Sequence, residues 1–352
     1  MPGIPETGIR KTEEIQKNRH QNLYKNYQPM DHFLICHRGA LGDFILTWPV
    51  LYTLRKSLPD LPFMGIGRPE YMRLAVSLGL LDSFCHAESS ELAGFFSGQS
   101  VPPVFGSPRG AVLWLAEGQA VAGLLKKSGA SLPVAVIPPF PRKRMHVSRY
   151  HWLAVQSYFP AVEGMYPCSL CFFPGERKSH YALIHPGSGS QAKNYQPRVY
   201  RELADELRQQ GMADVRFVLG PVETQDGRTA QYLAGERVEM PEDVETLARL
   251  QVGASLYIGN DSGASHLAGA LGTTTVALYK VTDPEVWGVM GERVTNLKAE
   301  SEDSALWQVR EYMRKAGNRT CLTMCIGVHH QGDYHARGNK KTEEKIPSET
   351  ST

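Results

Sequence analysis

The sequence lacks long apolar runs and carries almost no net charge. None of its hydrophobic segments is long enough to cross a bilayer, and residues 1–22 lack the apolar core of a secretory signal peptide. We therefore expect a cytoplasmic protein. The 38 Lys and Arg residues against 36 Asp and Glu residues give a formal charge of +2, so no global field attracts nucleic acid. Any basic surface for a partner must be local.

Motifs of three large enzyme classes are also missing. The sequence contains no G-x-x-x-x-G-K-[ST] phosphate loop, and no G-x-G-x-x-G follows an early strand, which argues against a nicotinamide dehydrogenase. The G-x-S-x-G elbow of serine hydrolases would place glycines two residues before and after Ser262, where the chain has Asn260 and Ala264. We therefore do not expect Ser262 to act as a nucleophile.

Cysteine is scarce, with six residues in 352, which is typical of reduced thiols in the cytoplasm. Cys168 and Cys171 form one close pair, and Cys321 and Cys325 form another. A structural zinc site is one interpretation, because thiolates at close spacing bind zinc. About 150 residues separate the pairs, so ordinary buried thiols are the favoured interpretation and no metal site is predicted.

Strand and helix patterns alternate along most of the chain, which predicts an α/β fold with mostly parallel sheets covered on both faces. The length suits two domains. We predict an arm over residues 1–30, Rossmann-like domains over 31–165 and 166–330, and a disordered tail over 331–352. Two such domains face each other across a ligand cleft. The sequence predicts strands at 32–36, 62–67, 110–116, 132–137, 181–187, 215–221 and 254–261, and helices at 43–59, 197–211, 243–251 and 264–271.

The first glycine-containing loop, HRGALGDFILTWP, follows the first predicted strand. Gly39 and Gly42 permit a tight turn, and Asp43 falls at the start of a helix. The carboxylate could serve as the helix N-cap. Alternatively, it is a general base at the mouth of the cleft that takes a proton from a hydroxyl. Position along the chain does not separate these two interpretations.

Two loops of the second half carry residues suited to a nucleotide. HPGSGSQAKNYQP offers backbone amides, the hydroxyls of Ser188 and Ser190, and the charge of Lys193 to phosphate oxygens. VLGPVET delivers Glu223 to the same strand edge, where it could bind ribose hydroxyls or cap the next helix. Because the carboxyl ends of parallel strands meet at one edge, these loops are expected to lie together.

A third loop, IGNDSGASHLAGALG, indicates strand, tight turn and helix, with Asp261 or Ser262 as the N-cap. Gly263 lets the backbone approach a ligand, and the first helical amides favour an anion. His266 lies on the first turns of this helix, where it either reaches a phosphate or packs against the sheet. Together, the loops suit a diphosphate.

These motifs, in this order over about residues 32–295, resemble glycosyltransferase family 9, the bacterial heptosyltransferases of the lipopolysaccharide core. The most specific stretch is DSGASHLAGALG followed by TDP. The resemblance implies the GT-B fold, an ADP-heptose donor, inversion at the anomeric carbon, a lipopolysaccharide core or related envelope glycan as acceptor, and no required metal or cofactor.

The resemblance also implies a role for each matching residue. Asp43 matches the acidic residue proposed as the base, and Glu223 matches the one near the donor nucleoside. Lys193 offsets the charge on the leaving diphosphate. The remaining donor-binding positions are Ser188, Ser190, Asp261, Ser262, Gly263 and His266.

The chain also departs from the family pattern. Gly39 and Ala40 replace a frequent Ser-Ser, and Tyr195 stands where many members have Trp. Met240 and Pro241 stand where the family lines the nucleobase pocket, but the local match does not name a base, so ADP is favoured over other nucleotides.

A local basic cluster, PRKRMHVSRYH, groups Arg142, Lys143, Arg144 and Arg149. We predict that it binds the anionic groups of a glycolipid acceptor and holds the enzyme at the inner face of the cytoplasmic membrane. A solvated loop is the simpler interpretation. Arg68 and Arg73 are weaker candidates for the same surface.

Two other functions remain open at this level. A GT-B nucleotide-sugar epimerase would need further acid and base residues in the cleft. A degenerate family member would bind a nucleotide sugar or glycan without catalysis, although the presence of Asp43, Lys193 and His266 argues against it.

Overall fold

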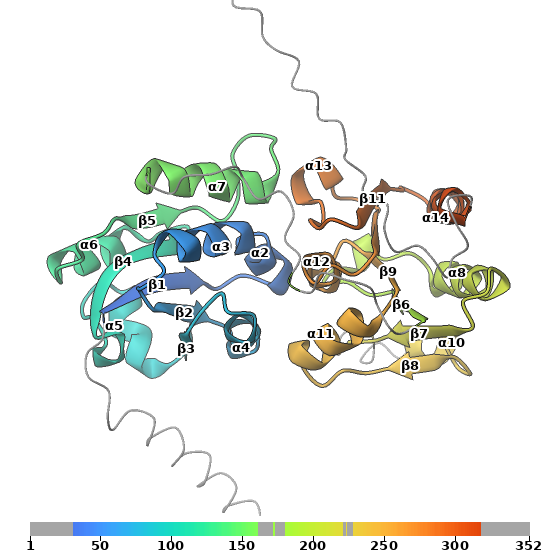
Figure 1. Ribbon diagram of the computed structural model, residues 1–352, viewed down its shortest axis with the longest axis horizontal. Helices are drawn as coiled ribbons and strands as arrows, with labels where there is room; N and C mark the ends of the chain where they lie inside the picture. Colours follow the sequence, from blue (N-terminus) through green and yellow to red (C-terminus); the bar gives the residue numbers. More distant parts are fainter. Residues whose placement is uncertain (1–30, 161–171, 173–179, 221–222, 224–227, 318–352) are drawn as a thin grey trace, which may run out of the picture.

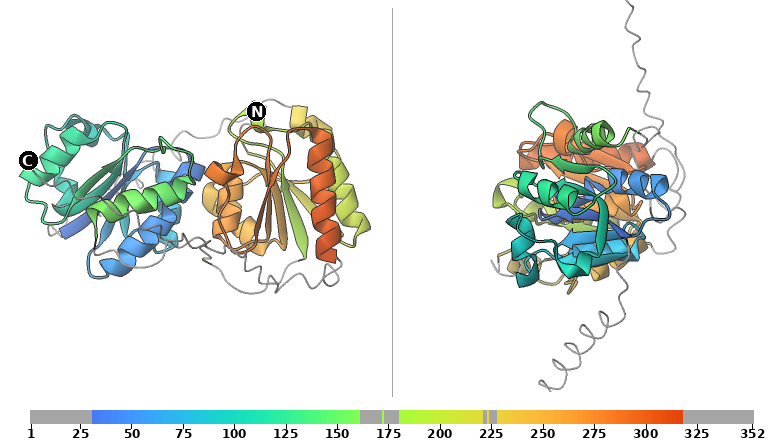
Figure 2. Two further views of the ribbon diagram at one scale, coloured as in Figure 1. Left: turned by 90° about the horizontal axis from the view of Figure 1, so that it is seen from above. Right: turned by 90° about the vertical axis from the view of Figure 1, so that its left-hand side faces the viewer.

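The structure is a computed structural model that describes residues 31–160, 172, 180–220, 223 and 228–317. The predicted arm, the predicted tail, most of the join between the domains and both cysteine pairs lie outside these residues. The described chain forms two parallel sheets, each flanked by helices, as Figures 1 and 2 show. The α/β class predicted from the sequence is therefore confirmed.

The N-terminal half is built on a five-stranded sheet. Its elements are β1 (Asp31–His37), α2 (Leu41–Ile45), α3 (Trp48–Ser57), β2 (Phe63–Gly67), α4 (Pro69–Ser77), β3 (Ser83–His86), η1 (Ser90–Leu92), α5 (Ala93–Phe96), η2 (Pro103–Phe105), β4 (Ser107–Trp114), α6 (Gln119–Lys127), β5 (Val134–Ile137) and α7 (Val147–Tyr158). The strand order is β3-β2-β1-β4-β5, with every pair parallel. In β1, Phe33 and Ile35 enter one core while Leu34 and Cys36 enter the core on the other face.

The C-terminal half is built on a six-stranded sheet. Its elements are β6 (Tyr181–His185), η3 (Gln191–Lys193), α8 (Pro197–Gln209), β7 (Asp214–Val218), α10 (Arg228–Tyr232), β8 (Arg237–Glu239), α11 (Val244–Gly253), β9 (Leu256–Asn260), α12 (Gly263–Ala270), β10 (Thr275–Tyr279), α13 (Pro284–Trp287), β11 (Val294–Lys298) and α14 (Glu302–Gly317). The order is β11-β10-β9-β6-β7-β8, again all parallel. Ile184 and Ile258 lie in one core and Leu183 and Tyr257 in the opposite one.

The single helix predicted over residues 43–59 is wrong, because the chain forms α2 and α3 with a break between them. Pro49 lies in the first turn of α3, where its missing N–H is tolerated; inside one long helix it would remove a hydrogen bond and crowd the preceding turn. Thr47, the N-cap of α3, donates its hydroxyl to the carbonyl of Phe44 at 2.7 Å. The break turns α2 into a short separate helix at the end of β1.

The two halves meet where α2 packs against α12 (Figure 1). A second contact joins the loop before α7 to the α13 region, where His146 Nε2 lies 3.0 Å from the carbonyl oxygen of Gly288. Phe140 packs edge-on against Trp287 with ring centroids 5.4 Å apart. No helix in the described part of the chain combines the length and apolarity that crossing a bilayer requires.

Candidate active site

Asp43 is the third residue of α2, which begins directly after the loop that follows β1. The N-cap is Ala40, so the interpretation of Asp43 as the N-cap is wrong. Its carboxylate lies over Gly39, where an added Cβ would come within 3.3 Å of Oδ2. Burial raises the pKa of Asp43, against the lowering effects of the Ala40 backbone and of Lys193, and Asp261 raises it further. A carboxylate with a raised pKa is a stronger base than an ordinary aspartate.

Lys193 and Asp261 form an ion pair between two loops of the C-terminal half. Lys193 ends η3, and its Nζ donates to Asp261 Oδ2 at 2.7 Å. Thr282 Oγ1 donates to the same oxygen at 2.6 Å. The lysine side chain is 29% exposed whereas the aspartate is 6% exposed, so the cation is the partner that a ligand can reach.

The N-terminus of α12 has the geometry that the sequence predicts. Ser262 is the N-cap and accepts from the Ser265 N–H at 3.3 Å, so Ser262 and not Asp261 fills this role. Gly263 is the first helical residue and lies against α2 of the other half. Because the first amides of a helix carry partial positive charge, this end favours an anion.

His266 is buried between the two halves. Its Nε2 lies 3.9 Å from Asp261 Oδ1, and its Cδ2 would be 3.1 Å from a Cβ placed on Gly42. Burial lowers the pKa of His266 to about 4, although Asp261 acts in the opposite direction. The imidazole is therefore neutral near pH 7. It packs against α2 of the other half.

The two loop serines differ in their surroundings. The Ser188 hydroxyl is buried, 2.7 Å from Asn194 Oδ1 and 2.8 Å from the Ser190 carbonyl. Asn260 donates to the same Asn194 oxygen at 3.1 Å and accepts from the Tyr200 hydroxyl at 2.6 Å. Ser190 is exposed. Ser188 therefore shapes the loop, while Ser190 is open to a ligand; phosphate binding by both stays a prediction.

Glu223 is buried beside the same loop. Its Oε2 accepts from the Gly220 N–H at 2.8 Å and lies 3.9 Å from His185 Nε2. Burial opposes ionisation, but His185 and the Gly220 amide outweigh it, so the pKa of Glu223 is lowered. The carboxylate fills the space that a side chain on Gly187 would need. The hydrogen bond from the Gly220 N–H, three residues earlier, is typical of a glutamate in the first turn of a helix that caps the helix N-terminus. Ribose binding by Glu223 stays a prediction.

The four predicted acceptor-binding cations do not have equal surroundings. Arg144 reaches across to the other half and pairs with Asp283 at 2.8 Å and Glu285 at 2.5 Å. Arg142, Lys143 and Arg149 are exposed and form no ion pair with any described residue. Acceptor binding by all four stays a prediction.

Arg68 and Arg73 do not join this surface. Arg68 is the N-cap of α4 and Arg73 lies within it, and α4 packs beside β2 and β3. The basic cluster instead leads into α7, which packs beside β5 at the opposite edge of the sheet (Figure 1). The interpretation that joined these arginines to the cluster is wrong.

Three contributors to the site carry no role in the sequence prediction. Thr282 holds Asp261, and Asn194 and Asn260 hold the loop that ends at Lys193. Position along the chain could have indicated Thr282, because it follows β10 and therefore lies at the same edge of the sheet as Asp261, which follows β9.

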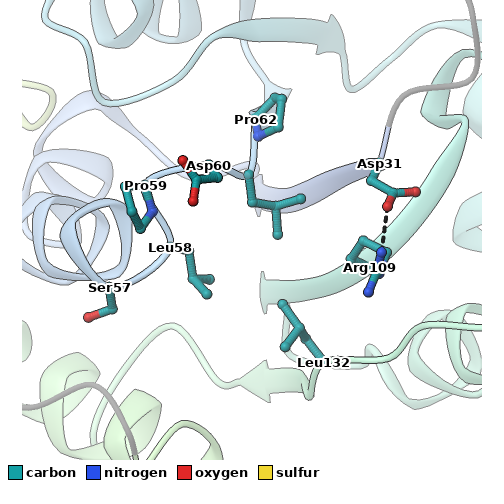
Figure 3. A pocket seen from close by; sticks show the side chains of 9 residues that line it. Asp31, Ser57, Leu58, Pro59, Asp60, Pro62, Arg109 and Leu132 are labelled. Carbon is teal, nitrogen blue, oxygen red and sulfur yellow. Dashed lines mark hydrogen bonds and ion pairs between the residues drawn. The ribbon is translucent and has the colours of Figure 1, made fainter.

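A cavity of about 640 Å³ lies away from these loops, and Figure 3 shows the residues that line it. It opens at the amino ends of β1 and β4, beside the Asp31–Arg109 ion pair, whereas ligands of such sheets bind at the carboxyl ends. Over the same residues, no group of three or more His, Cys, Asp or Glu side chains is arranged to hold a metal ion.

Comparison with known families gives one match, which covers residues 109–315 and more than half of the chain. That family is described as Glycosyltransferase family 9 (heptosyltransferase). The matched range includes every predicted donor-binding residue but not the loop with Asp43. No curated protein matches the sequence significantly.

Solved structures that share the fold include a family 9 glycosyl transferase and two heptosyltransferases. A family 9 glycosyl transferase from Veillonella parvula DSM 2008 has a TM-score of 0.63 at 18% identity, over 85% of this chain and 95% of that one. E. coli heptosyltransferase WaaC with ADP has a TM-score of 0.61 at 15% identity, over 81% and 99%. E. coli ADP-heptose lps heptosyltransferase II has a TM-score of 0.59 at 15% identity, over 81% and 99%.

At these identities the structural likeness concerns the fold, and it confirms the predicted GT-B arrangement of two parallel sheets. Membership rests on the family match. The chain belongs to glycosyltransferase family 9 and is a glycosyltransferase.

Proposed function

We propose that the protein moves a heptose from ADP-heptose, with inversion, onto a hydroxyl of a lipopolysaccharide core or related envelope glycan. The observation that carries this proposal is the Lys193–Asp261 ion pair beside the N-terminus of α12. Both charges of this pair are close enough to Asp43, in the other half, to shift its pKa. We assign acceptor binding to a domain of residues 31–165 and donor binding to a domain of residues 166–330.

The donor side suits a nucleoside diphosphate. Lys193 and the first amides of α12 would face the two phosphates, with Ser190 beside them. Glu223 would take the ribose hydroxyls after giving up its contact with Gly220. ADP is favoured because a similar fold, E. coli WaaC, is known with ADP.

The proposed reaction uses these positions in one concerted displacement. Asp43 accepts the proton of the acceptor hydroxyl while the oxygen of that hydroxyl attacks the anomeric carbon of the donor sugar. The new carbon–oxygen bond forms on the face opposite the diphosphate, which inverts the configuration. The old carbon–oxygen bond breaks, and its electron pair leaves on ADP. Lys193 and α12 stabilise the charge that builds on the leaving phosphate, so no metal is required.

Exposed cations of the N-terminal half would bind the anionic acceptor. Arg142, Lys143 and Arg149 are exposed and free to bind phosphates or carboxylates of an anionic glycan. Arg144 would contribute only by exchanging Asp283 and Glu285 for the acceptor.

Calorimetric titration with ADP, UDP and GDP, with and without EDTA, tests the donor proposal. We expect selective ADP binding that EDTA does not change. Lys193→Ala should weaken ADP binding about 10- to 100-fold, since a charge-assisted contact to phosphate is lost. Lys315→Ala on α14, an exposed lysine of the same half, is the matched control and should bind ADP normally.

Other outcomes have distinct meanings. A preference for UDP or GDP would remove heptose as the expected sugar. Binding that needs a metal would contradict the role given to Lys193 and α12. Conversion of the donor alone to an epimer would indicate an epimerase, and binding without turnover on any acceptor would indicate a degenerate member.

A further inference from the structure

One segment of the chain is cationic in a protein that is otherwise slightly acidic. Residues 118–162 contain six Lys and Arg residues and no Asp or Glu. Since the whole chain has a formal charge of +2, the remaining residues carry −4. The described part of this segment forms α6, β5, the loop before α7 and α7 itself, which together make one edge of the N-terminal sheet.

Most of these cations are exposed and unpaired. Lys126 and Lys127 on α6, and Arg142, Lys143 and Arg149 around the start of α7, form no ion pair with residues that the structure describes. Arg144 differs, because Asp283 and Glu285 from the other half neutralise it. The loop and α7 therefore present three uncompensated charges to solvent.

Large apolar side chains are exposed on the same elements. Phe140, Leu153 and Tyr158 are 48%, 45% and 40% exposed. They make up three of the eight exposed large hydrophobic residues in the described chain. Leu153 lies four residues after Arg149 on α7, so the two share one face of the helix.

The position of this surface relates it to the active site. The loop between β5 and α7 contacts α13 through Phe140, Arg144 and His146. In Figure 1, α7 runs from this contact along the outside of the N-terminal half. A molecule held on α7 would therefore lie next to the junction of the two halves.

We infer that α7 and its preceding loop form a docking surface for an anionic lipid bilayer, with Arg142, Lys143 and Arg149 on the headgroups and Leu153 in the interface. Cations beside exposed aromatic and leucine side chains fit a bilayer surface. A nucleic-acid surface would need the charges but not an exposed leucine. The inference deepens the proposed function by naming where a membrane-borne acceptor would be met, and it rests on that function only for the acceptor.

The test is sedimentation of the full chain with vesicles of phosphatidylglycerol and phosphatidylcholine in equal parts, or of phosphatidylcholine alone, without any glycolipid. Arg142→Gln/Lys143→Gln should weaken binding to the anionic vesicles about 30-fold, at roughly fivefold per cation. Leu153→Ser should weaken it severalfold. Arg314→Gln/Lys315→Gln on α14, with the same change in charge, should bind like wild type.

Thermal melting of each variant confirms that it is folded. Equal binding of wild type to both vesicle types, normal binding by the loop variant, or an equal loss in the α14 variant would each overturn the inference. Tighter binding of a single-stranded RNA to the same residues would overturn it in favour of nucleic acid. ADP titration of the wild type is measured separately, so a failure of the donor proposal is distinguishable from a failure of the membrane surface.

Discussion

The backbone of Gly263 lies directly against the backbone of Gly42. A Cβ added to Gly263 would lie 2.9 Å from the Cβ of Leu41 and 3.1 Å from the Gly42 nitrogen. Gly42 precedes the predicted base Asp43, and Gly263 starts the helix that is predicted to face the diphosphate. The contact between two residues without side chains therefore sets how closely the two parts of the site approach.

Gly263→Ala should separate these parts while leaving both sheets intact. Because a misplacement of about 1 Å can cost on the order of 100-fold in rate, we expect kcat to fall about 10- to 100-fold. ADP affinity, measured by calorimetry, should change much less. Gly123→Ala in α6 is the control, since an added Cβ there meets no atom within 4 Å. Equal activity of the two variants would contradict this account.

The central strands were predictable from the sequence because they are buried on both faces and appear as apolar runs. Residues 33–36 of β1 and 256–258 of β9 are examples. Four strands are not among the predicted ones. The central strand β10 has a buried apolar run, TVALY, that the prediction missed. The edge strands β3, β8 and β11 have the sequences SFCH, RVE and VTNLK, which are only partly buried, so no apolar run or alternation marks them.

The site was predictable as a set of loops but not as a set of contacts. Glycine-rich turns after strands give the positions of Asp43, Lys193 and Asp261. That Lys193 pairs with Asp261, 68 residues away, depends on two loops meeting at one sheet edge. Arg144 resembles its cationic neighbours in the sequence, and only its contact with Asp283, 139 residues away, distinguishes it.

Asp43→Asn should lower kcat about 100- to 10,000-fold with little change in ADP affinity, because a general base is lost. In the wild type, burial raises the pKa of Asp43. As pH is lowered, Asp43 should therefore become protonated, and the rate should decrease, at a higher pH than for an ordinary aspartate. The measurement is initial rate against pH with saturating donor and acceptor. Wild-type turnover by the Asn variant would remove Asp43 as the base.

Thr282→Val should weaken donor binding by releasing Asp261, whose Oδ2 accepts from Thr282 at 2.6 Å. One hydrogen bond to a charged group contributes about 1.5–3 kcal/mol, so KM for the donor should rise about 10-fold or more. Thr282→Ser retains the hydroxyl and should restore the wild-type value. An unchanged KM in the Val variant, or no rescue by Ser, would show that Thr282 does not position the pair.

Three buried histidines should make stability depend on pH. Burial lowers the pKa of His37 and His266 to about 4 and that of His151 to about 3. Between pH 6.5 and 4 the unfolded chain binds protons at these positions while the folded chain does not. The free energy of unfolding should therefore fall as pH falls, by up to about 1.4 kcal/mol per pH unit for each histidine.

Urea unfolding at pH 7.5, 6 and 5 measures this dependence. Carboxylates with a lowered pKa, such as Asp82, lose their contribution only below about pH 4, so they leave this window largely unaffected. His37→Gln should reduce the slope, since one of the buried neutral histidines is removed. Stability that stays constant or increases between pH 6.5 and 5 would contradict the burial of neutral histidines.

Tyr200→Phe should destabilise the loop that ends at Lys193. The Tyr200 hydroxyl is fully buried and donates to Asn260 Oδ1 at 2.6 Å, and Asn260 in turn holds Asn194. Removing the donor leaves a buried amide oxygen unsatisfied, which costs about 1–3 kcal/mol of unfolding free energy. ADP affinity should fall as well, because the loop is less ordered before binding. Tyr52→Phe, at an exposed position on α3, should change neither quantity; equal effects of the two substitutions would show that the buried network does not support the loop.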